Sequence, residues 1–226
     1  MYEYQCDSEH VPCGCGLNNV RFTESRIINA ENAIGYSWSM VVSIRANRDS
    51  EHLCGGSIID DSLILTAASC IADTPLYGIT VVAGTYRTGE STPFIRQADA
   101  VFIHPDYEGF LNNFTNDIAI LHLSRPLDLK DLFLSRTCLS QKLSFLPNAT
   151  DYPAVDTLLA IVGWGNTDYE NQTVPQVLQQ AEVFTSDLND PNCPVQGKNH
   201  EFQFCAGTIQ NDKGNHISCL DRMITR

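Results

Sequence analysis

The sequence predicts an all-β fold, arranged as a barrel or a sandwich. Short segments rich in β-branched residues recur along the middle of the chain, and each is bounded by glycine, proline, asparagine or aspartate. No long helical period competes with them. A length of 226 residues, with 43% hydrophobic and 18% charged residues, is typical of a globular chain with one large or two small domains.

The first predicted strands lie in the N-terminal half. Residues 39–45 read SMVVSIR, residues 56–60 read GSIID, residues 63–67 read LILTA and residues 79–83 read ITVVA. Valine, isoleucine and threonine favour extended backbone, whereas the polar and glycine positions between these segments favour turns. We therefore expect four consecutive strands separated by short connections.

The later predicted strands follow the same rule. Residues 100–104 read AVFIH, residues 118–123 read IAILHL, residues 158–162 read LLAIV and residues 179–184 read QQAEVF. Residues 1–25 differ from all of these, because they are polar and rich in cysteine. We expect them to form an extension tethered by disulfide bonds.

Charge and cysteine spacing exclude several functions. A net charge of −13 argues against nucleic acid as a partner, because phosphate binding draws on clustered lysine and arginine. The nine cysteines include no recurring CxxC pair, and the cluster Cys13-Gly14-Cys15 would need His10 or Cys6 and a further donor to bind zinc. We therefore expect disulfides rather than a metal site, and no cofactor.

Glycosylation sequences point to the same compartment. Asn-x-Thr sequences occur at Asn113, Asn148 and Asn171, and such acceptors matter only in a secreted chain. Together with the cysteines they predict an oxidising, extracellular destination. The first five residues contain no apolar run, so either a signal peptide precedes Met1 or the chain begins at the mature end. No apolar stretch is long enough to span a membrane.

Several stretches of the chain resemble the trypsin and chymotrypsin-like serine peptidases in order and separation. They read RIINAENAIGYSWSMVVSI, LCGGSIIDDSLILTAASC, HPDY, NDIAILHL, AIVGWGN and FCAGTI, between Arg26 and Cys219. The resemblance implies two perpendicular antiparallel β-barrels with an active site in the cleft between them. It also implies a peptidase domain over residues 26–226, with its second barrel incomplete at the C-terminus, and a light-chain-like extension over residues 1–25.

The resemblance also implies a disulfide framework. Cys54 would pair with Cys70, and Cys193 with Cys205. Cys138 would hold one of three cysteines in the extension, leaving the other two to pair with each other: Cys6, Cys13 and Cys15. Cys219 has its partner downstream in the family, so the odd cysteine count is what a truncated framework would show.

Two members of the expected catalytic triad are substituted. Asp117 matches the family's aspartate, but Ser69 stands where the family has its histidine base. A serine hydroxyl has no useful basicity at pH 7 and cannot accept a proton as imidazole does. The other histidines match no base position, and we expect each to be a solvated or packing residue: His10, His52, His104, His122, His200 and His216.

The nucleophile and the activation site depart from the family as well. Counting from Cys219 places Met223 at the serine position and Arg222 at the aspartate before it, in place of the family's GDSGG. Cleavage after Arg26 would free Ile27, whose ammonium would meet Arg222 with like charge. The alternative is that Arg26–Ile27 is only an exposed loop.

These substitutions predict a family member without measurable peptidase activity. Its partners by resemblance are polypeptide substrates or peptidase inhibitors. Three interpretations stay open at this point: an enzyme with a defective gene model, a non-catalytic homologue that binds or regulates, and an incomplete or mis-spliced fragment. Ser69 argues against the first, because a lost terminus does not explain a lost histidine.

Overall fold

A computed structural model describes most of the chain, in ranges separated by gaps. The described residues are 2–5, 7, 10–22, 30–46, 52–112, 114–139, 153–165, 175–187, 189–190, 193 and 204–207. Its strands are β1 (Tyr2–Tyr4), β2 (Val20–Phe22), β3 (Glu31–Asn32), β4 (Val41–Ala46), β5 (His52–Asp60), β6 (Leu63–Thr66), β7 (Ile79–Val82), β8 (Ile95–Ile103), β9 (Ala119–Leu123), β10 (Leu158–Gly163), β11 (Gln179–Ser186) and β12 (Cys205–Gly207).

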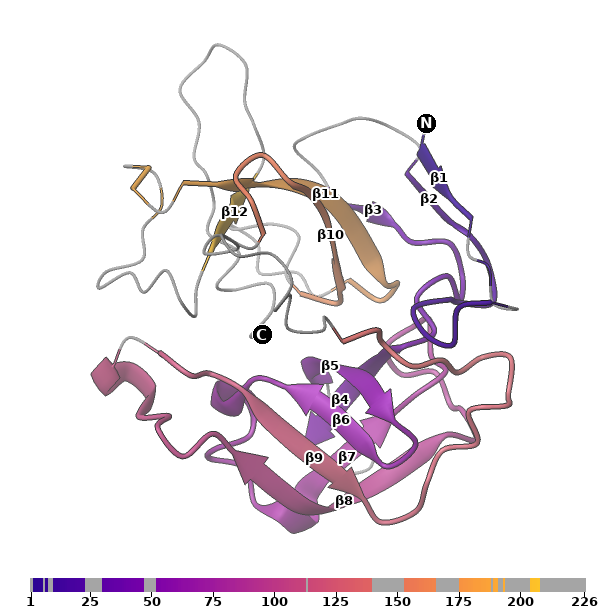
Figure 1. Ribbon diagram of the computed structural model, residues 1–226. Helices are drawn as coiled ribbons and strands as arrows, with labels where there is room; N and C mark the ends of the chain where they lie inside the picture. The colour runs from indigo at the N-terminus through magenta and orange to yellow at the C-terminus, as the bar shows by residue number, and fades with distance from the viewer. Residues whose placement is uncertain are drawn as a thin grey trace.

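Six of these strands form a closed antiparallel barrel, in the lower part of Figure 1. The order around the barrel is β4-β5-β6-β9-β8-β7, and β7 pairs with β4 to close it. The closure resolves the choice between barrel and sandwich in favour of a barrel. The described helices are short 3-10 turns, η1 (Ala68–Cys70), η2 (Leu76–Gly78) and η3 (Gly109–Asn112), and none of them could cross a membrane.

Apolar side chains from every strand of the barrel fill its interior. In β9 the alternation is clear, because Ala119, Leu121 and Leu123 are buried while the residues between them are not. Gly56, the second residue of the Gly-Gly pair in β5, allows this close packing. A Cβ on Gly56 would lie 2.8 Å from Cγ2 of Ile64, so only glycine fits at this point of the wall.

A second antiparallel sheet lies beside the barrel and carries the later strands. β11 pairs with β10, with β12 and with the two-residue β3. A separate cluster of buried side chains, including Met40, Trp164 and Leu178, packs here. The indole N–H of Trp38 donates to the buried Gln180 side chain over 2.9 Å, which links the start of the barrel to β11. The all-β, chymotrypsin-like fold class is confirmed.

In the N-terminal extension β1 and β2 form a two-stranded antiparallel sheet, and the extension is fastened to the rest of the chain. Arg21 and Glu3 form an ion pair of 2.8 Å across this sheet. A disulfide joins Cys13 to Cys138, and the backbone N–H of Gly14 donates to the carbonyl of Arg136 over 2.6 Å. The extension is therefore held by both covalent and hydrogen bonds.

All eight predicted strands have a counterpart, but two begin earlier than expected. β5 begins at His52 and β8 at Ile95, so each takes in polar or glycine residues of low β-propensity. In both cases pairing with a neighbouring strand overrides local preference: Arg45 pairs with His52, and Thr80 pairs with Gln97. The short strands β1, β2, β3 and β12 were not predicted.

Candidate functional site

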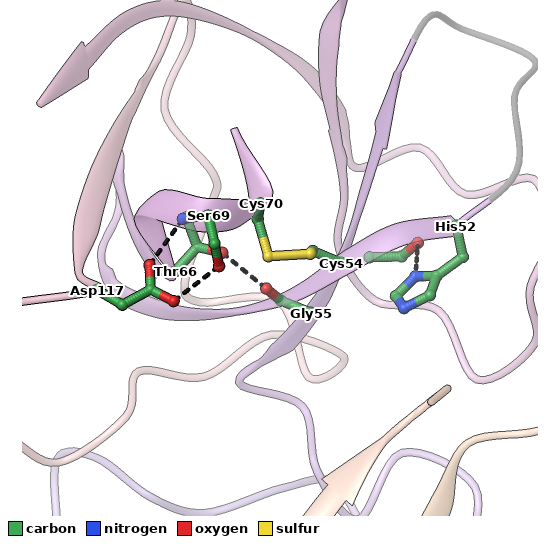
Figure 2. The surroundings of a disulfide bond; sticks show 8 residues. His52, Cys54, Gly55, Thr66, Ser69, Cys70 and Asp117 are labelled. Atoms are coloured by element: carbon green, nitrogen blue, oxygen red, sulfur yellow. Dashed lines mark hydrogen bonds between the residues drawn. A yellow bond between two sulfur atoms is a disulfide. The ribbon is translucent and has the colours of Figure 1, made fainter. Parts of the chain in front are cut away.

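Ser69 and Asp117, the two matched triad positions inside the described residues, lie in direct contact. The Ser69 hydroxyl donates to Oδ2 of Asp117 over 2.7 Å, and the Ser69 backbone N–H donates to Oδ1 over 2.7 Å. Each carboxylate oxygen therefore accepts one hydrogen bond from the same residue (Figure 2). A bidentate arrangement of this kind fixes the orientation of the carboxylate.

The pairing of β6 with β9 brings the two residues together. Thr66, the last residue of β6, is opposite Ala119, the first residue of β9. Ser69 follows Thr66 within the turn η1, and Asp117 precedes Ala119. Just before Asp117, Asn116 has a positive φ of 60°, a left-handed conformation that asparagine tolerates well. Local backbone geometry and long-range pairing thus place Asp117 under η1.

A disulfide and a side-chain hydrogen bond hold the turn in place. Cys70, next to Ser69, is bonded to Cys54 of β5. The Thr66 hydroxyl donates to the carbonyl of Gly55 over 2.9 Å, which ties the end of β6 to the same strand (Figure 2). The position of Ser69 is thereby fixed by covalent and hydrogen bonds that do not involve its side chain.

The negative charge of Asp117 affects the pKa of a neighbouring tyrosine, Tyr107. Burial, followed by the negative charges of Asp117 and Asp73, raises the pKa of Tyr107 above its usual 10.0. Tyr107 stays protonated at neutral pH and supplies no base. The described groups around Asp117 therefore include a hydroxyl and a phenol but no group that accepts a proton near pH 7.

The described histidines make their contacts elsewhere. His10 Nδ1 lies 2.8 Å from Asp7, and His122 Nδ1 lies 2.5 Å from Asp99. His104 Nδ1 accepts the N–H of Asp106 over 3.2 Å, and His52 Nδ1 lies 2.9 Å from the Ser43 hydroxyl. None of these ring contacts, within the described ranges, reaches Asp117. His200 and His216 lie outside the described residues.

The arrangement at Ser69 can orient a carboxylate but lacks a base. In a catalytic triad the carboxylate bonds an imidazole that in turn takes the proton of a nucleophile. Here the side chain that bonds Asp117 is a hydroxyl, which is a hydrogen-bond donor to the carboxylate and no proton acceptor at neutral pH. Within the described residues, this pair provides a carboxylate held by two hydrogen bonds from Ser69.

Three disulfides have both of their cysteines inside the described residues. They are Cys13–Cys138, Cys54–Cys70 and Cys193–Cys205. Among the cysteines of the extension, the structure selects Cys13 for Cys138, and Cys15 is disulfide-bonded as well. Other predicted site residues lie outside the described residues: Arg26, Ile27, Asn113, Asn148, Asn171 and Met223.

Sequence reasoning missed one cluster of polar residues. Ser43 and Arg45 of β4 lie with their side chains buried, and His52 of β5 contacts both Ser43 and the ring of Trp164. The sequence held one signal for it. Ser43 and Arg45 are polar positions two apart in an apolar strand, so they lie on the same face of β4.

Comparisons with known proteins agree with the fold. The trypsin family model matches residues 27–216. The chain is 33% identical over 215 residues to ovochymase of Halocynthia roretzi, covering 91% of this chain and 13% of ovochymase. It is 32% identical over 159 residues to chymotrypsin-C of Bos taurus, covering 69% of this chain and 55% of that protein.

The chain belongs to the trypsin/chymotrypsin-like serine peptidase family. The resemblance stated from its motifs is thereby confirmed. The chain spans about an eighth of the ovochymase length and about half of the chymotrypsin-C length. Its disulfide bonds and its family fit an extracellular protein.

Proposed function

We propose that this chain is a non-catalytic member of the trypsin family, which binds polypeptide substrates or peptidase inhibitors without hydrolysing them. The observation that carries the proposal is the pair of 2.7 Å hydrogen bonds from Ser69 to both oxygens of Asp117. They support the proposal because the side chain in contact with this carboxylate is a hydrogen-bond donor, whereas the family's mechanism requires a base there. Loss of triad members typically costs about 10⁶-fold in turnover.

The sequence around the expected nucleophile supports the same proposal. Counting from Cys219, Met223 occupies the serine position, and a thioether cannot form and release an acyl intermediate. Arg222 stands at the position whose carboxylate pairs with the new terminus after activation. Cleavage between Arg26 and Ile27 would therefore create an ammonium without its acidic partner.

The proposal extends to the organisation and location of the chain. Residues 1–25 form a Cys-rich extension and residues 26–226 the trypsin-like domain. The protein is secreted and carries N-linked glycans at Asn113, Asn148 and Asn171. The Cys13–Cys138 disulfide supports the extension as a tethered segment, and the disulfides as a whole support an oxidising compartment.

Two assays test the missing activity. The chain, expressed with its disulfides formed, is incubated with a fluorophosphonate probe and with chromogenic peptide substrates, beside active bovine chymotrypsin. We expect neither labelling nor hydrolysis. Ser69→His should remain inactive too, because it restores only the base. Covalent labelling of the unmodified chain, at a rate comparable to the active control, would refute the proposal.

A separate assay tests binding. Pancreatic trypsin inhibitor, immobilised on a sensor surface, presents the kind of extended loop that trypsin-like peptidases bind. We expect saturable binding by the chain and none by a heat-unfolded sample. Folding is checked independently by near-ultraviolet circular dichroism. A folded chain that binds neither this inhibitor nor denatured casein would overturn the binding role while leaving the absence of catalysis standing.

A further inference from the structure

A small pocket lies between the loop that joins β7 to β8 and two other segments of the chain. Its volume is about 210 Å³. Three aromatic and two acidic side chains line it, namely Tyr36, Phe94, Phe133, Glu90 and Asp131. No lysine or arginine occurs among the described residues that line it, and all of these lie within the continuous stretches 30–46, 52–112 and 114–139. The pocket therefore combines negative charge with aromatic surface.

Hydrogen bonds fix the carboxylate of Glu90 at this pocket. Its Oε2 atom accepts the backbone N–H groups of Tyr86 and Arg87 over 3.0 and 3.1 Å, and its Oε1 atom accepts the hydroxyl of Tyr36 over 3.3 Å. Burial raises the pKa of Glu90, but these bonds and one from the Thr85 hydroxyl outweigh burial and hold the pKa below its usual 4.5. All of these donors are neutral, so they hold the carboxylate in place without cancelling its charge.

Packing and a further hydrogen bond fix the aromatic walls of the pocket. The rings of Tyr36 and Phe133 meet edge to face, with their centroids 4.8 Å apart. A Cβ on Gly84 would lie 2.6 Å from Cδ2 of Phe94, so only glycine leaves room for this ring. The backbone N–H of Phe133 donates to Oδ1 of Asp131 over 3.0 Å, which ties this wall to the second carboxylate. Phe133 is 38% exposed, so part of its ring surface is open to a ligand.

This lining favours an organic cation over a metal ion. A calcium ion takes about six to eight oxygen ligands, whereas phenylalanine rings supply none. The face of an aromatic ring carries negative charge density and attracts an ammonium group that lies within about 6 Å of the ring centroid. A carboxylate adds a charge-assisted hydrogen bond to the same group. The chemistry of the pocket therefore fits an alkylammonium ion.

We propose that this pocket binds a primary ammonium group on a chain of the size of a lysine side chain, between the carboxylate of Glu90 and the rings of Tyr36 and Phe133. The volume supports this size. Pockets for drug-sized ligands typically measure about 300–1,000 Å³, so a pocket of about 210 Å³ suits one side chain or one small amine. The site goes beyond the proposed function, because it uses neither Ser69 nor Asp117.

The test measures ammonium-dependent stability. Thermal unfolding of the unmodified chain is followed with Nα-acetyl-lysine methylamide and with Nα-acetyl-norleucine methylamide, which has the same chain length without the amino group. Sodium chloride keeps the ionic strength constant, because a chain with a net charge of −13 attracts any cation. We expect the unfolding midpoint to rise and saturate with the lysine probe alone, since a ligand that binds only the folded state stabilises it. An equal rise with both probes, or none with either, overturns the proposal.

Two variants, each with a matched control, test the residues of the site. Phe133→Leu removes an aromatic face but keeps an apolar side chain, so it should weaken the apparent affinity for the lysine probe about threefold. Its control is Phe102→Leu, an exposed residue of β8 outside the lining. Glu90→Gln removes the charge and should weaken the affinity at least about tenfold, whereas Glu108→Gln, at an exposed position, should not. Full affinity in both folded pocket variants overturns the proposal.

A further arm identifies the source of the ammonium group. Butylammonium chloride is compared with the lysine probe on the unmodified chain. Tighter binding of the lysine probe assigns the pocket to lysine side chains of polypeptides, whereas equal or tighter binding of butylammonium assigns it to small amines. Stabilisation by calcium chloride but by neither amine would assign the carboxylates to a metal ion and overturn the proposal.

A direct measurement covers the case in which the pocket variants do not fold. The ring resonances of Tyr36 and Phe133 in the unmodified, isotope-labelled chain are followed by NMR during a titration with the lysine probe. A saturable shift of these resonances, with the Phe102 ring unaffected, supports the site. Unchanged resonances up to the solubility limit of the probe refute it.

Discussion

The imidazole of His52 packs against the indole of Trp164, with the ring centroids 5.3 Å apart. His52 begins β5 of the barrel, and Trp164 directly follows β10 of the second sheet. Burial, and then the charge of Arg45, lowers the pKa of His52 from 6.5 to about 4. A neutral ring therefore connects the barrel to the second sheet at physiological pH.

This histidine predicts a loss of stability in mild acid. Its pKa in the folded chain lies below its unfolded value, so the unfolded chain binds more protons between about pH 6.5 and pH 4. The free energy of unfolding should fall as pH drops through this window, by on the order of 2 kcal/mol. Urea denaturation at several pH values measures it. His52→Phe should flatten the slope and His10→Asn should not; an unaltered slope in His52→Phe would contradict the assignment.

We expect the Ser69 hydroxyl to make a modest contribution to the free energy of unfolding. Ser69→Ala removes the hydroxyl bond to Asp117 but keeps the backbone N–H bond. Because a hydrogen bond to a partly exposed charged group is worth about 1 kcal/mol, we expect a loss of that size in the free energy of unfolding. The control is Ser62→Ala, whose hydroxyl bonds the exposed Asp61. Equal effects in the two variants would show that the Asp117 contact adds nothing.

We expect substitution by alanine to affect stability differently at the two glycines of β5. Gly56→Ala places a methyl group 2.8 Å from Ile64 and 3.1 Å from Val42, so overpacking should cost roughly 1–3 kcal/mol. Gly55→Ala meets no atom within 4 Å and should change stability by less than about 0.5 kcal/mol. Chemical denaturation compares them. A tolerated Gly56→Ala would mean that the barrel wall yields more readily than its packing indicates.

The Cys13–Cys138 disulfide predicts how the chain behaves after cleavage. If dilute trypsin cuts after Arg26, the two pieces should migrate as one band without reductant and as two with it. Replacing Cys13 and Cys138 by serine should release the N-terminal piece without reductant. Replacing Cys193 and Cys205 should not, because that disulfide lies within the larger piece. Separation of the unmodified pieces in the absence of reductant would argue against the pairing.

The barrel strands were predictable because the β-propensity of their residues and the burial of those residues favour the same structure. Residues such as Val81 and Ile64 favour extended backbone and are also buried in the core, so local preference and burial point the same way. β3 and β12 could not be predicted, because two or three residues carry no period and depend on β11 for their pairing. The pairing of β3 with β11 joins residues nearly 150 positions apart in the sequence and leaves no local trace.

The site was only partly predictable. The motifs singled out Ser69 and Asp117, which lie in contact, but the paired hydrogen bonds between them depend on the geometry of η1. The pairing of Cys138 with Cys13 was left open among three cysteines, since spacing alone does not choose between neighbours two residues apart. Arg45 was missed because a charged residue at the end of a strand normally reaches solvent, and here it does not.

Strand β9 is the last of the barrel strands in the sequence, yet it sits between β6 and β8. On the ribosome, a nascent chain that has emerged only as far as Ile103 exposes the edges of both neighbours, each open to pairing with another polypeptide. The hazard ends once Leu123 emerges and the gap is filled. Substitutions that weaken β9 should therefore reduce the yield of folded protein more than they reduce the stability of the molecules that do fold.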